Sequence, residues 1–147
     1  MLLSSEVGDF ADEIRRIFRE LGRGGEADAL AGECSPPIDV LETDEALEIT
    51  VDVPGVEAAG VRVAIKGDMV LIAGEKLPRR GRGDSSFHLV ERGFGRFART
   101  VRLSAACETA KARLTLQRGE LRLTLPKLRE RRGQLIEIHV ETEKLRN

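Results

Sequence analysis

Apolar and polar residues alternate along most of the chain between residues 38 and 127, and this period of two is typical of half-buried β-strands. The pattern is clearest in 110–117 and 121–125, where every second residue is Ala or Leu and the residues between are charged or polar. Gln117-Arg118-Gly119 interrupts it, and glycine can adopt the positive φ of a tight turn. This stretch predicts a β-hairpin with one apolar face, which Pro126 closes because proline has no N–H.

Shorter runs of the same kind precede the hairpin, and turn pairs such as Pro54-Gly55 and Gly67-Asp68 separate them. The run 69–73 is apolar on both faces, which predicts an inner strand. No second helical pattern occurs between residues 36 and 127. Seven or eight short strands with frequent turns predict an all-β fold, an antiparallel immunoglobulin-like β-sandwich. The strands before the hairpin are expected at 38–41, 47–53, 61–66, 69–73, 87–91 and 97–103.

A helical pattern comes first in the chain. Its apolar residues fall at offsets 0, 4, 7, 8 and 11 from residue 10, which places them in one stripe of an amphipathic helix. Asp9 can cap this helix and Gly22 can end it. Two hypotheses remain: the helix packs on its own domain, or it is mobile and offers its stripe to other proteins. A helix of this length is marginal alone in water, so it must pack against something. The stripe consists of Phe10, Ile14, Ile17, Phe18 and Leu21.

Composition narrows the class of protein. The 147 residues suit one domain, 41% are hydrophobic, and the absence of Trp and Tyr predicts an aliphatic core. A net charge of −1 and the few aromatic residues argue against a nucleic-acid partner, and Arg79-Arg80-Gly81-Arg82 is interpreted as a solvated loop. The longest apolar run is too short to span a membrane, and no signal-peptide pattern occurs. We expect a soluble cytoplasmic protein.

Residues that carry chemistry do not form a recognisable cluster. His88 and His139 stand alone, and Cys107 has no histidine nearby in the sequence. Cys34 and Cys107 lack metal-ligand spacing and do not make a disulfide framework. Residues 93–98 formally fit a dinucleotide-binding motif, but they open a strand rather than a helix. The sequence therefore predicts no enzyme, no metal and no cofactor.

Four short motifs occur in a fixed order over about ninety residues, and together they carry a resemblance. They are Asp52-Val53-Pro54-Gly55-Val56, then Leu71-Ile72-Ala73-Gly74-Glu75, then Glu91-Arg92 with Gly95, Phe97 and Arg99, then the hairpin 112–127 ending in Leu125-Pro126-Lys127. The chain resembles the small heat shock proteins of bacterial and plant type, and 36–127 resembles their α-crystallin domain. Two residues depart from the family pattern: Glu120 stands in place of Val and Ser104 in place of Pro.

The resemblance implies an ATP-independent holdase, a chaperone that binds unfolding proteins and prevents their aggregation. It divides the chain into an N-terminal arm (1–35), the α-crystallin domain (36–127) and a C-terminal extension (128–147). The helix stripe is the expected client-binding surface. A monomeric co-chaperone-like adaptor is the alternative, but it should lack both the tail motif and the long loop of this chain. An enzyme on a β-sandwich would need a convergent polar site.

The resemblance also implies that Ile136-Glu137-Ile138 docks in a groove of a neighbouring subunit. The groove is expected between the strands at 61–66 and 110–117, where exposed strand edges can accept an extended peptide. The alternatives are one more sandwich strand or a chance match. Residues 128–134 span about 20 Å when extended, which is enough to reach another subunit. Five apolar residues are expected to line the groove: Val61, Val63, Ile65, Leu114 and Leu116.

A long loop separates Glu75 from Glu91, as in bacterial and plant family members. In those proteins the loop carries a short strand that pairs with the partner's sandwich. We therefore expect a strand-swapped homodimer through 85–90, which assembles further into a homo-oligomer. Arg99 should lie near this interface, where its guanidinium can pair with a carboxylate. The expected interface residues are Phe87, His88, Leu89 and Arg99.

Overall fold

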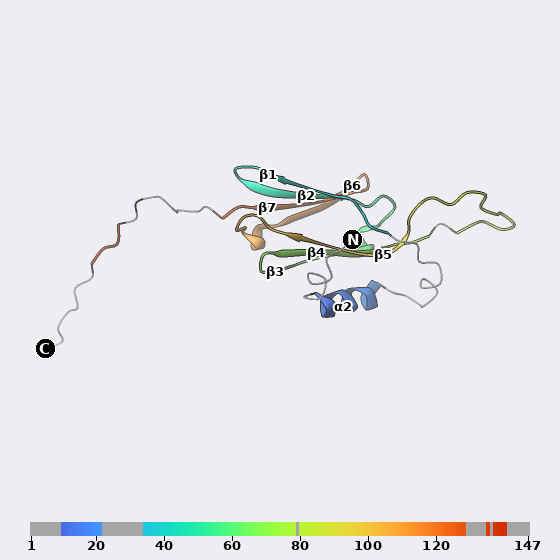
Figure 1. Ribbon diagram of the computed structural model, residues 1–147, viewed down its shortest axis with the longest axis horizontal. Helices are drawn as coiled ribbons and strands as arrows, with labels where there is room; N and C mark the ends of the chain where they lie inside the picture. The colour runs from blue at the N-terminus through green and yellow to red at the C-terminus, as the bar shows by residue number, and fades with distance from the viewer. Residues whose placement is uncertain (1–9, 22–33, 79, 129–134, 136, 141–147) are drawn as a thin grey trace.

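The computed structural model describes residues 10–21, 34–78, 80–128, 135 and 137–140. Two antiparallel β-sheets lie face to face, and helix α2 (Ala11–Leu21) lies against the outer side of one of them (Figure 1). This confirms the predicted β-sandwich with a short N-terminal helix. The four-stranded sheet has the order β1 (Ile38–Glu42), β2 (Ala46–Asp52), β7 (Glu120–Pro126), β6 (Arg113–Gln117). The three-stranded sheet has the order β3 (Val61–Lys66), β4 (Met69–Lys76), β5 (Gly95–Arg102).

The core between the sheets is aliphatic apart from Phe97, as the composition predicts. Burial alternates along β2 and β7, so one face of each strand packs inward and the other meets solvent. Burying each such side chain stabilises the fold by about 1.5–3 kcal/mol relative to leaving it exposed. The buried cluster consists of Leu47, Ile49, Val51, Val53, Val56, Val61, Val70, Ile72, Phe97, Leu121, Leu123 and Leu125.

The C-terminal hairpin turns at two residues. Arg118 and Gly119 have φ values of 54° and 77°, which are the signs required by a tight hairpin turn. The Gly119 carbonyl accepts a hydrogen bond from Val53 N at 2.7 Å, so the turn is tied to the end of β2. The first strand is shorter than predicted, because 109–111 forms a turn of 3-10 helix and β6 begins only at Arg113.

Gly74 lies where β4 meets the core, and the space above its Cα is filled. It pairs with Phe97 on β5 and with Val61 on β3. A Cβ at this position would lie 2.5 Å from the Gly60 carbonyl oxygen and 2.7 Å from Cζ of the Phe97 ring. The close approach explains in physical terms why glycine occupies position 74 of the motif 71–75.

Polar side chains link the two sheets by hydrogen bonds along one long side of the sandwich. Arg99 on β5 donates from Nη1 to the Pro36 carbonyl at 2.8 Å, just before β1. Ser104, after β5, donates from Oγ to Oε1 of Glu42 at the end of β1, at 3.1 Å. These contacts place edge strands β1 and β5 on the same side of the molecule. The other two edge strands, β3 and β6, therefore lie on the opposite side.

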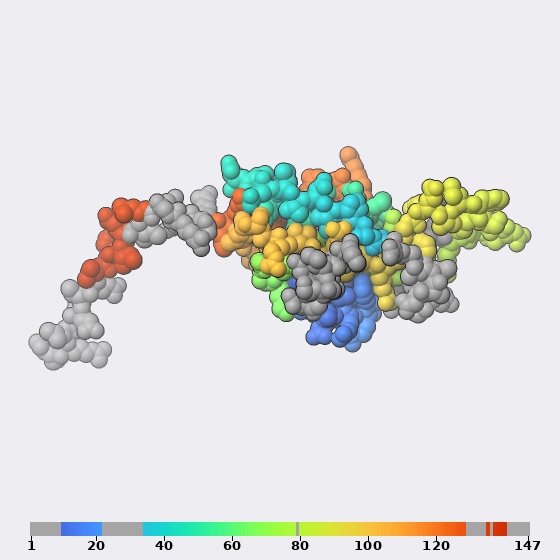
Figure 2. Space-filling view, viewed as in Figure 1, coloured from blue at the N-terminus to red at the C-terminus, as the bar shows by residue number. Residues whose placement is uncertain are grey.

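The strand predicted at 87–91 does not form within the single chain. Residues 80–92 are all exposed, and the segment projects from one end of the sandwich as a long loop (Figure 2). No other described strand lies beside it to complete a ladder. An alternating segment can be extended without forming a strand when nothing pairs with its backbone.

Candidate functional site

The edges of β3 and β6 direct both apolar side chains and backbone groups to one side of the sandwich. In antiparallel ladders, hydrogen-bonded and non-hydrogen-bonded pairs alternate. The two-residue turns after Lys66 and after Gln117 therefore leave the N–H and C=O groups of Val63, Ile65, Leu114 and Leu116 pointing away from the neighbouring strand. The side chains of these residues border the inter-sheet core. An extended peptide placed here would meet apolar side chains and backbone partners together.

The five predicted groove residues differ in accessibility. Val63, Ile65 and Leu116 are half-buried against the core, and Leu114 is 47% exposed. Val61 is buried, and its carbonyl accepts a hydrogen bond from Nη1 of Arg62 at 3.0 Å. The structure thus brings four of the five residues to an accessible edge, while Val61 belongs to the core.

The C-terminal tail leaves the sandwich from a fixed root. Leu128 N donates to the Ala106 carbonyl at 2.9 Å, and Lys127 N donates to the Glu45 carbonyl at 2.8 Å. The described tail residues 135 and 137–140 lie apart from the sandwich, in orange-red at the left of Figure 2. Ile138 is 87% exposed, and Ile136 lies outside the described residues. The tail therefore presents apolar side chains that its own sandwich does not cover.

Edge strand β1 offers a second open ladder. Pro37 O accepts from Asp52 N, and Thr43 N donates to Ala46 O, so odd-numbered residues of β1 bond to β2. The backbone groups of Val40 then point outward, and its side chain is 50% exposed. The long loop has its own uncovered apolar side chains, since Phe87 is 59% exposed and Leu89 74%.

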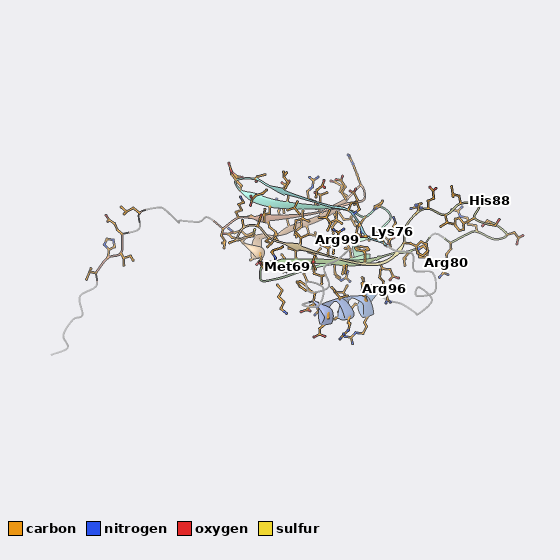
Figure 3. The ribbon with its side chains drawn as sticks, in the orientation of Figure 1. Met69, Lys76, Arg80, His88, Arg96 and Arg99 are labelled. Atoms are coloured by element: carbon orange, nitrogen blue, oxygen red, sulfur yellow. The ribbon has the colours of Figure 1, made fainter. Side chains whose placement is uncertain are left out.

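Arg99 lies on the long side of the sandwich where hydrogen bonds link the two sheets. Its guanidinium donates to the Pro36 carbonyl and, at 3.4 Å, to Oγ of Ser35. Neither acceptor is a carboxylate, so the expected ion pair is not what the described chain shows. The residue lies between the layers near β1, whereas His88 projects on the loop (Figure 3).

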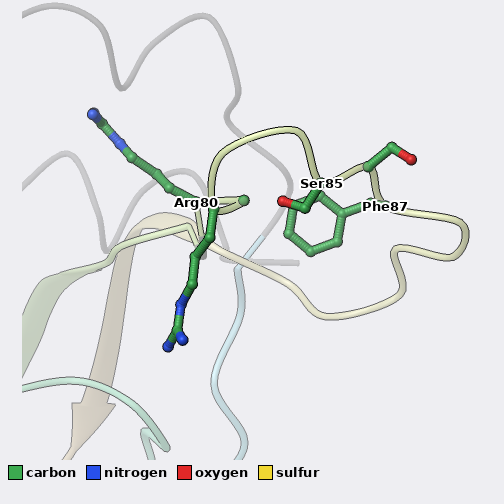
Figure 4. A pocket seen from close by; sticks show the side chains of 6 residues that line it. Arg80, Ser85 and Phe87 are labelled. Atoms are coloured by element: carbon green, nitrogen blue, oxygen red, sulfur yellow. The ribbon is translucent and has the colours of Figure 1, made fainter.

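A shallow hollow of about 350 Å³ lies within the long loop and is lined by Arg80, Arg82, Ser85, Ser86 and Phe87 (Figure 4). All of these residues are exposed. The hollow belongs to the projecting loop and not to the sandwich edges.

The helix stripe lies against the outer face of the three-stranded sheet. Phe10 and Ile17 are buried, while Ile14, Phe18 and Leu21 are half-buried. This agrees with the hypothesis of a helix packed on its own domain. Asp9 and Gly22, the expected cap and stop, lie outside the described residues.

The Hsp20/alpha crystallin family matches residues 39–141 of the chain, from the first strand through the tail motif. The chain belongs to this family. Membership of the Hsp20/alpha crystallin family supports a chaperone role and, in general, self-association. The match covers both sandwich edges and the tail described above.

Two relatives show the extent of the likeness. The chain is 30% identical over 142 residues to the 17.8 kDa class I heat shock protein of Solanum lycopersicum, covering 93% of this chain and 90% of that protein. It is 33% identical over 103 residues to spore protein SP21 of Stigmatella aurantiaca (strain DW4/3-1), covering 70% of this chain and 61% of that protein.

Solved structures share the fold. Heat shock protein 16.0 from Schizosaccharomyces pombe is 30% identical, with a TM-score of 0.64, and covers 74% of this chain and 100% of that chain. A small heat-shock protein from Xylella fastidiosa is 23% identical, with a TM-score of 0.63, and covers 76% of this chain and 100% of that chain. The α-crystallin fold of this Hsp20 family member is thereby established.

Both departures from the Hsp20 family pattern find polar partners. Glu120 is half-exposed in the hairpin and lies 3.6 Å from Nη2 of Arg122, an exposed pair that contributes about 0–1 kcal/mol. Ser104 donates to Glu42, which also lies 3.4 Å from Nζ of Lys127. A hydrogen-bonding residue at 104 thus helps to hold the side of the sandwich where β1 and β5 meet.

The two cysteines are half-buried and free. Burial raises the pKa of both thiols, although Lys76 near Cys34 and Lys127 near Cys107 oppose that shift. Less thiolate is then present at neutral pH, which disfavours nucleophilic chemistry. Among the described residues, no group of three His, Cys, Asp or Glu could hold a metal. No helix in the described part of the chain is long and apolar enough to cross a membrane.

Proposed function

We propose that this Hsp20 family member is an ATP-independent holdase, built as an oligomer of strand-swapped dimers. The observation that carries the proposal is the pair of open sandwich edges, β1 on one side and β3 with β6 on the other. Open edges are liabilities that proteins cover. The chain also carries two uncovered apolar segments, the long loop and the tail. Two open edges and two uncovered segments suit reciprocal pairing between subunits.

The tail is proposed to dock at the β3/β6 edge of a neighbouring subunit. Ile136-Glu137-Ile138 alternates, so both isoleucines face the same way in an extended chain. The edge offers Val63 and Ile65 from one strand and Leu114 and Leu116 from the other. Because the tail root is fixed at residues 127–128 and the tail lies apart from its own sandwich, docking on another subunit is geometrically favoured over docking on its own.

The loop is proposed to pair with β1 of the partner. Residues 85–90 alternate and have none of the described strands beside them, while Val40 directs its backbone N–H and C=O outward. Pairing would cover Phe87 and Leu89, complete the sheet edge, and make the dimer reciprocal, because each subunit has both parts. Arg99 supports this edge by holding Pro36 at the start of β1.

Val40→Pro is expected to weaken the dimer at least about tenfold, because it removes an outward N–H from the proposed interchain ladder. The sandwich itself should still fold, since that N–H does not bond to β2 and edge strands tolerate proline. Sedimentation velocity measures the dimer, and Val40→Ala, which keeps the N–H, is the matched control. A Val40→Pro protein that is folded and fully dimeric would rule out β1 as the pairing edge.

Client binding is proposed for the helix stripe, which gathers five large apolar side chains outside the sandwich core. Its five residues supply two aromatic rings and three aliphatic side chains on one face. They are covered in the structure, so release of α2 would expose them to unfolding proteins.

Light scattering of a heat-aggregating test protein, without nucleotide, tests the proposed function. The full chain at an equimolar subunit ratio is expected to suppress most of the scattering. Serum albumin at the same mass concentration controls for nonspecific crowding. If the scattering curve matches the albumin control at every ratio, the chain is not a holdase.

A further inference from the structure

The two outer faces of the sandwich differ in a way that the proposed oligomer does not use. The outer face of the four-stranded sheet is polar, with Glu48, Thr50, Arg122 and Thr124 on it. That is usual for a sheet with one solvated face. The outer face of the three-stranded sheet carries an apolar patch among its polar residues instead, and α2 covers this patch. We call this surface the helix-binding face; it consists of Ala64, Met69, Leu71, Ala73 and Ala98.

The helix-binding face is shaped to receive a helix. Ala73 pairs with Ala98 on β5, and small side chains let a helix approach the sheet closely. The larger side chains of Met69 and Leu71 lie next to the alanines and are buried beneath α2. Figure 1 shows α2 lying against the sheet that contains β4 and β5.

The contacts that hold α2 are ones that another amphipathic helix could repeat. Phe10 and Ile17 insert into the face, and the remaining stripe residues are only half-buried. At the rim, Nζ of Lys66 lies 3.7 Å from Oε1 of Glu13. Cζ of Arg96 lies 5.3 Å from the centre of the Phe18 ring, and Arg96 lies on the helix side of the sheet (Figure 3). A helix with an acidic residue and an aromatic ring at those positions could make the same contacts with Lys66 and Arg96.

Another helix could replace α2 on this face because α2 alone is not a stable helix. It has eleven residues, which is below the length at which an isolated helix is stable in water. Once released it loses helical order, while the face beneath it stays apolar and is then exposed. Exposed apolar patches of this kind mark interaction sites.

We propose that the helix-binding face is a second client site, which takes amphipathic helices of unfolding proteins in exchange for α2. This inference rests on the proposed holdase function. It assigns a chemistry to the client: an apolar stripe at helical spacing, with an acidic residue opposite Lys66. The β3/β6 edge, in contrast, suits extended peptides.

Fluorescence anisotropy on the full chain tests the proposal. The probe is a labelled synthetic helix with Leu at the five stripe positions, Glu at the position of Glu13, and an otherwise unrelated sequence. Ile17→Asp should undock α2, because a carboxylate cannot remain unpaired beneath the helix. Binding of the probe should then strengthen at least about tenfold over the unsubstituted chain, since the face becomes the populated state.

Two further variants separate this face from other surfaces. Adding Ala73→Glu to Ile17→Asp should abolish binding, whereas Thr50→Glu on the polar outer face should leave it unchanged. If Ala73→Glu does not fold, Lys66→Glu takes its place. Lys66→Glu should weaken binding of the Glu-bearing probe about threefold. A probe with Lys at the position of Glu13 should bind the Lys66→Glu protein without this loss.

Equal binding by the unsubstituted chain and Ile17→Asp would overturn the proposal, as would binding that survives Ala73→Glu. Binding only by a peptide copied from α2 would assign the face to a second copy of this chain, and competition by an extended alternating peptide would assign the probe to a sandwich edge. Both outcomes contradict a helical client site. Suppressed aggregation without probe binding rules out this inference and leaves the holdase standing. Probe binding without suppressed aggregation rules out the holdase, and with it the client role of a face that still binds helices.

Discussion

Replacing both Ile136 and Ile138 by alanine is expected to reduce the native particle to dimers. The proposed dimer uses the loop and β1, which this change does not touch. The higher assembly uses the two isoleucine side chains against the β3/β6 edge. Losing two such side chains at an interface removes about 3–6 kcal/mol of apolar burial for every tail that docks. Several tails act together in one assembly, so the free energies lost at the individual tails add and the overall association constant falls by a much larger factor. Light scattering coupled to size exclusion measures the mass.

The matched control is Val140→Ala, which shortens an exposed apolar side chain in the same tail but outside the motif. Its particle should keep the mass of the unsubstituted protein. A double alanine protein with an unchanged mass would show that the tail does not hold the assembly together. The sandwich should stay folded in all three proteins, as measured by circular dichroism, because the substitutions leave the buried core cluster unchanged.

Gly74→Ala is expected to destabilise the domain by about 3 kcal/mol, at the upper end of the usual cost of overpacking a core. The added methyl group meets the Gly60 carbonyl at 2.5 Å, and a backbone oxygen cannot rotate away as a side chain can. The Phe97 ring at 2.7 Å must also move. Thermal unfolding followed by circular dichroism, at fixed protein concentration, should show a Tm lower by about 10 °C or more.

Gly81→Ala is the control for Gly74→Ala. Its added methyl group meets first the Oγ of Ser85, at the tip of a side chain in an exposed loop. Its effect should be within about 0.5 kcal/mol, as for other surface substitutions. If Gly74→Ala and Gly81→Ala unfold at the same Tm, then Phe97 and residue 60 are not packed over β4 as described.

Strands in which apolar and polar residues alternate could be predicted, because the alternation directly reflects which side chains are buried. In β2 and β7 every second residue enters the core, and the hairpin turn at Arg118-Gly119 follows from residues adjacent in sequence. The run 69–73, apolar on both faces, predicts an inner strand, and this is confirmed because β4 lies between β3 and β5. What the pattern omits is the reason: one face of β4 meets the inter-sheet core and the other meets α2.

Other features depend on partners that are distant in sequence. The alternation of 87–91 indicates a strand, but a strand needs a neighbour, and the described part of the chain supplies none beside the loop. Arg99 donates to the Pro36 carbonyl, a contact that the sequence could not indicate because every residue carries a backbone carbonyl; its carboxylate partner at the subunit interface stays a prediction. Val61 alternates in step with Val63 and Ile65, yet it lies at the buried end of β3. In each case the missing information is the position of another element.

Amide hydrogen exchange on the native particle tests most directly the claim that strand edges hold the assembly together. The N–H groups of Val40, Val63, Ile65, Leu114 and Leu116 point out of the single sandwich. The account predicts that Val40 and at least one strand of the β3/β6 edge exchange slowly in the particle. In the double alanine tail variant, only the β3/β6 edge should become fast. Rapid exchange at Val40 and at both strands of that edge in the intact particle would contradict the account.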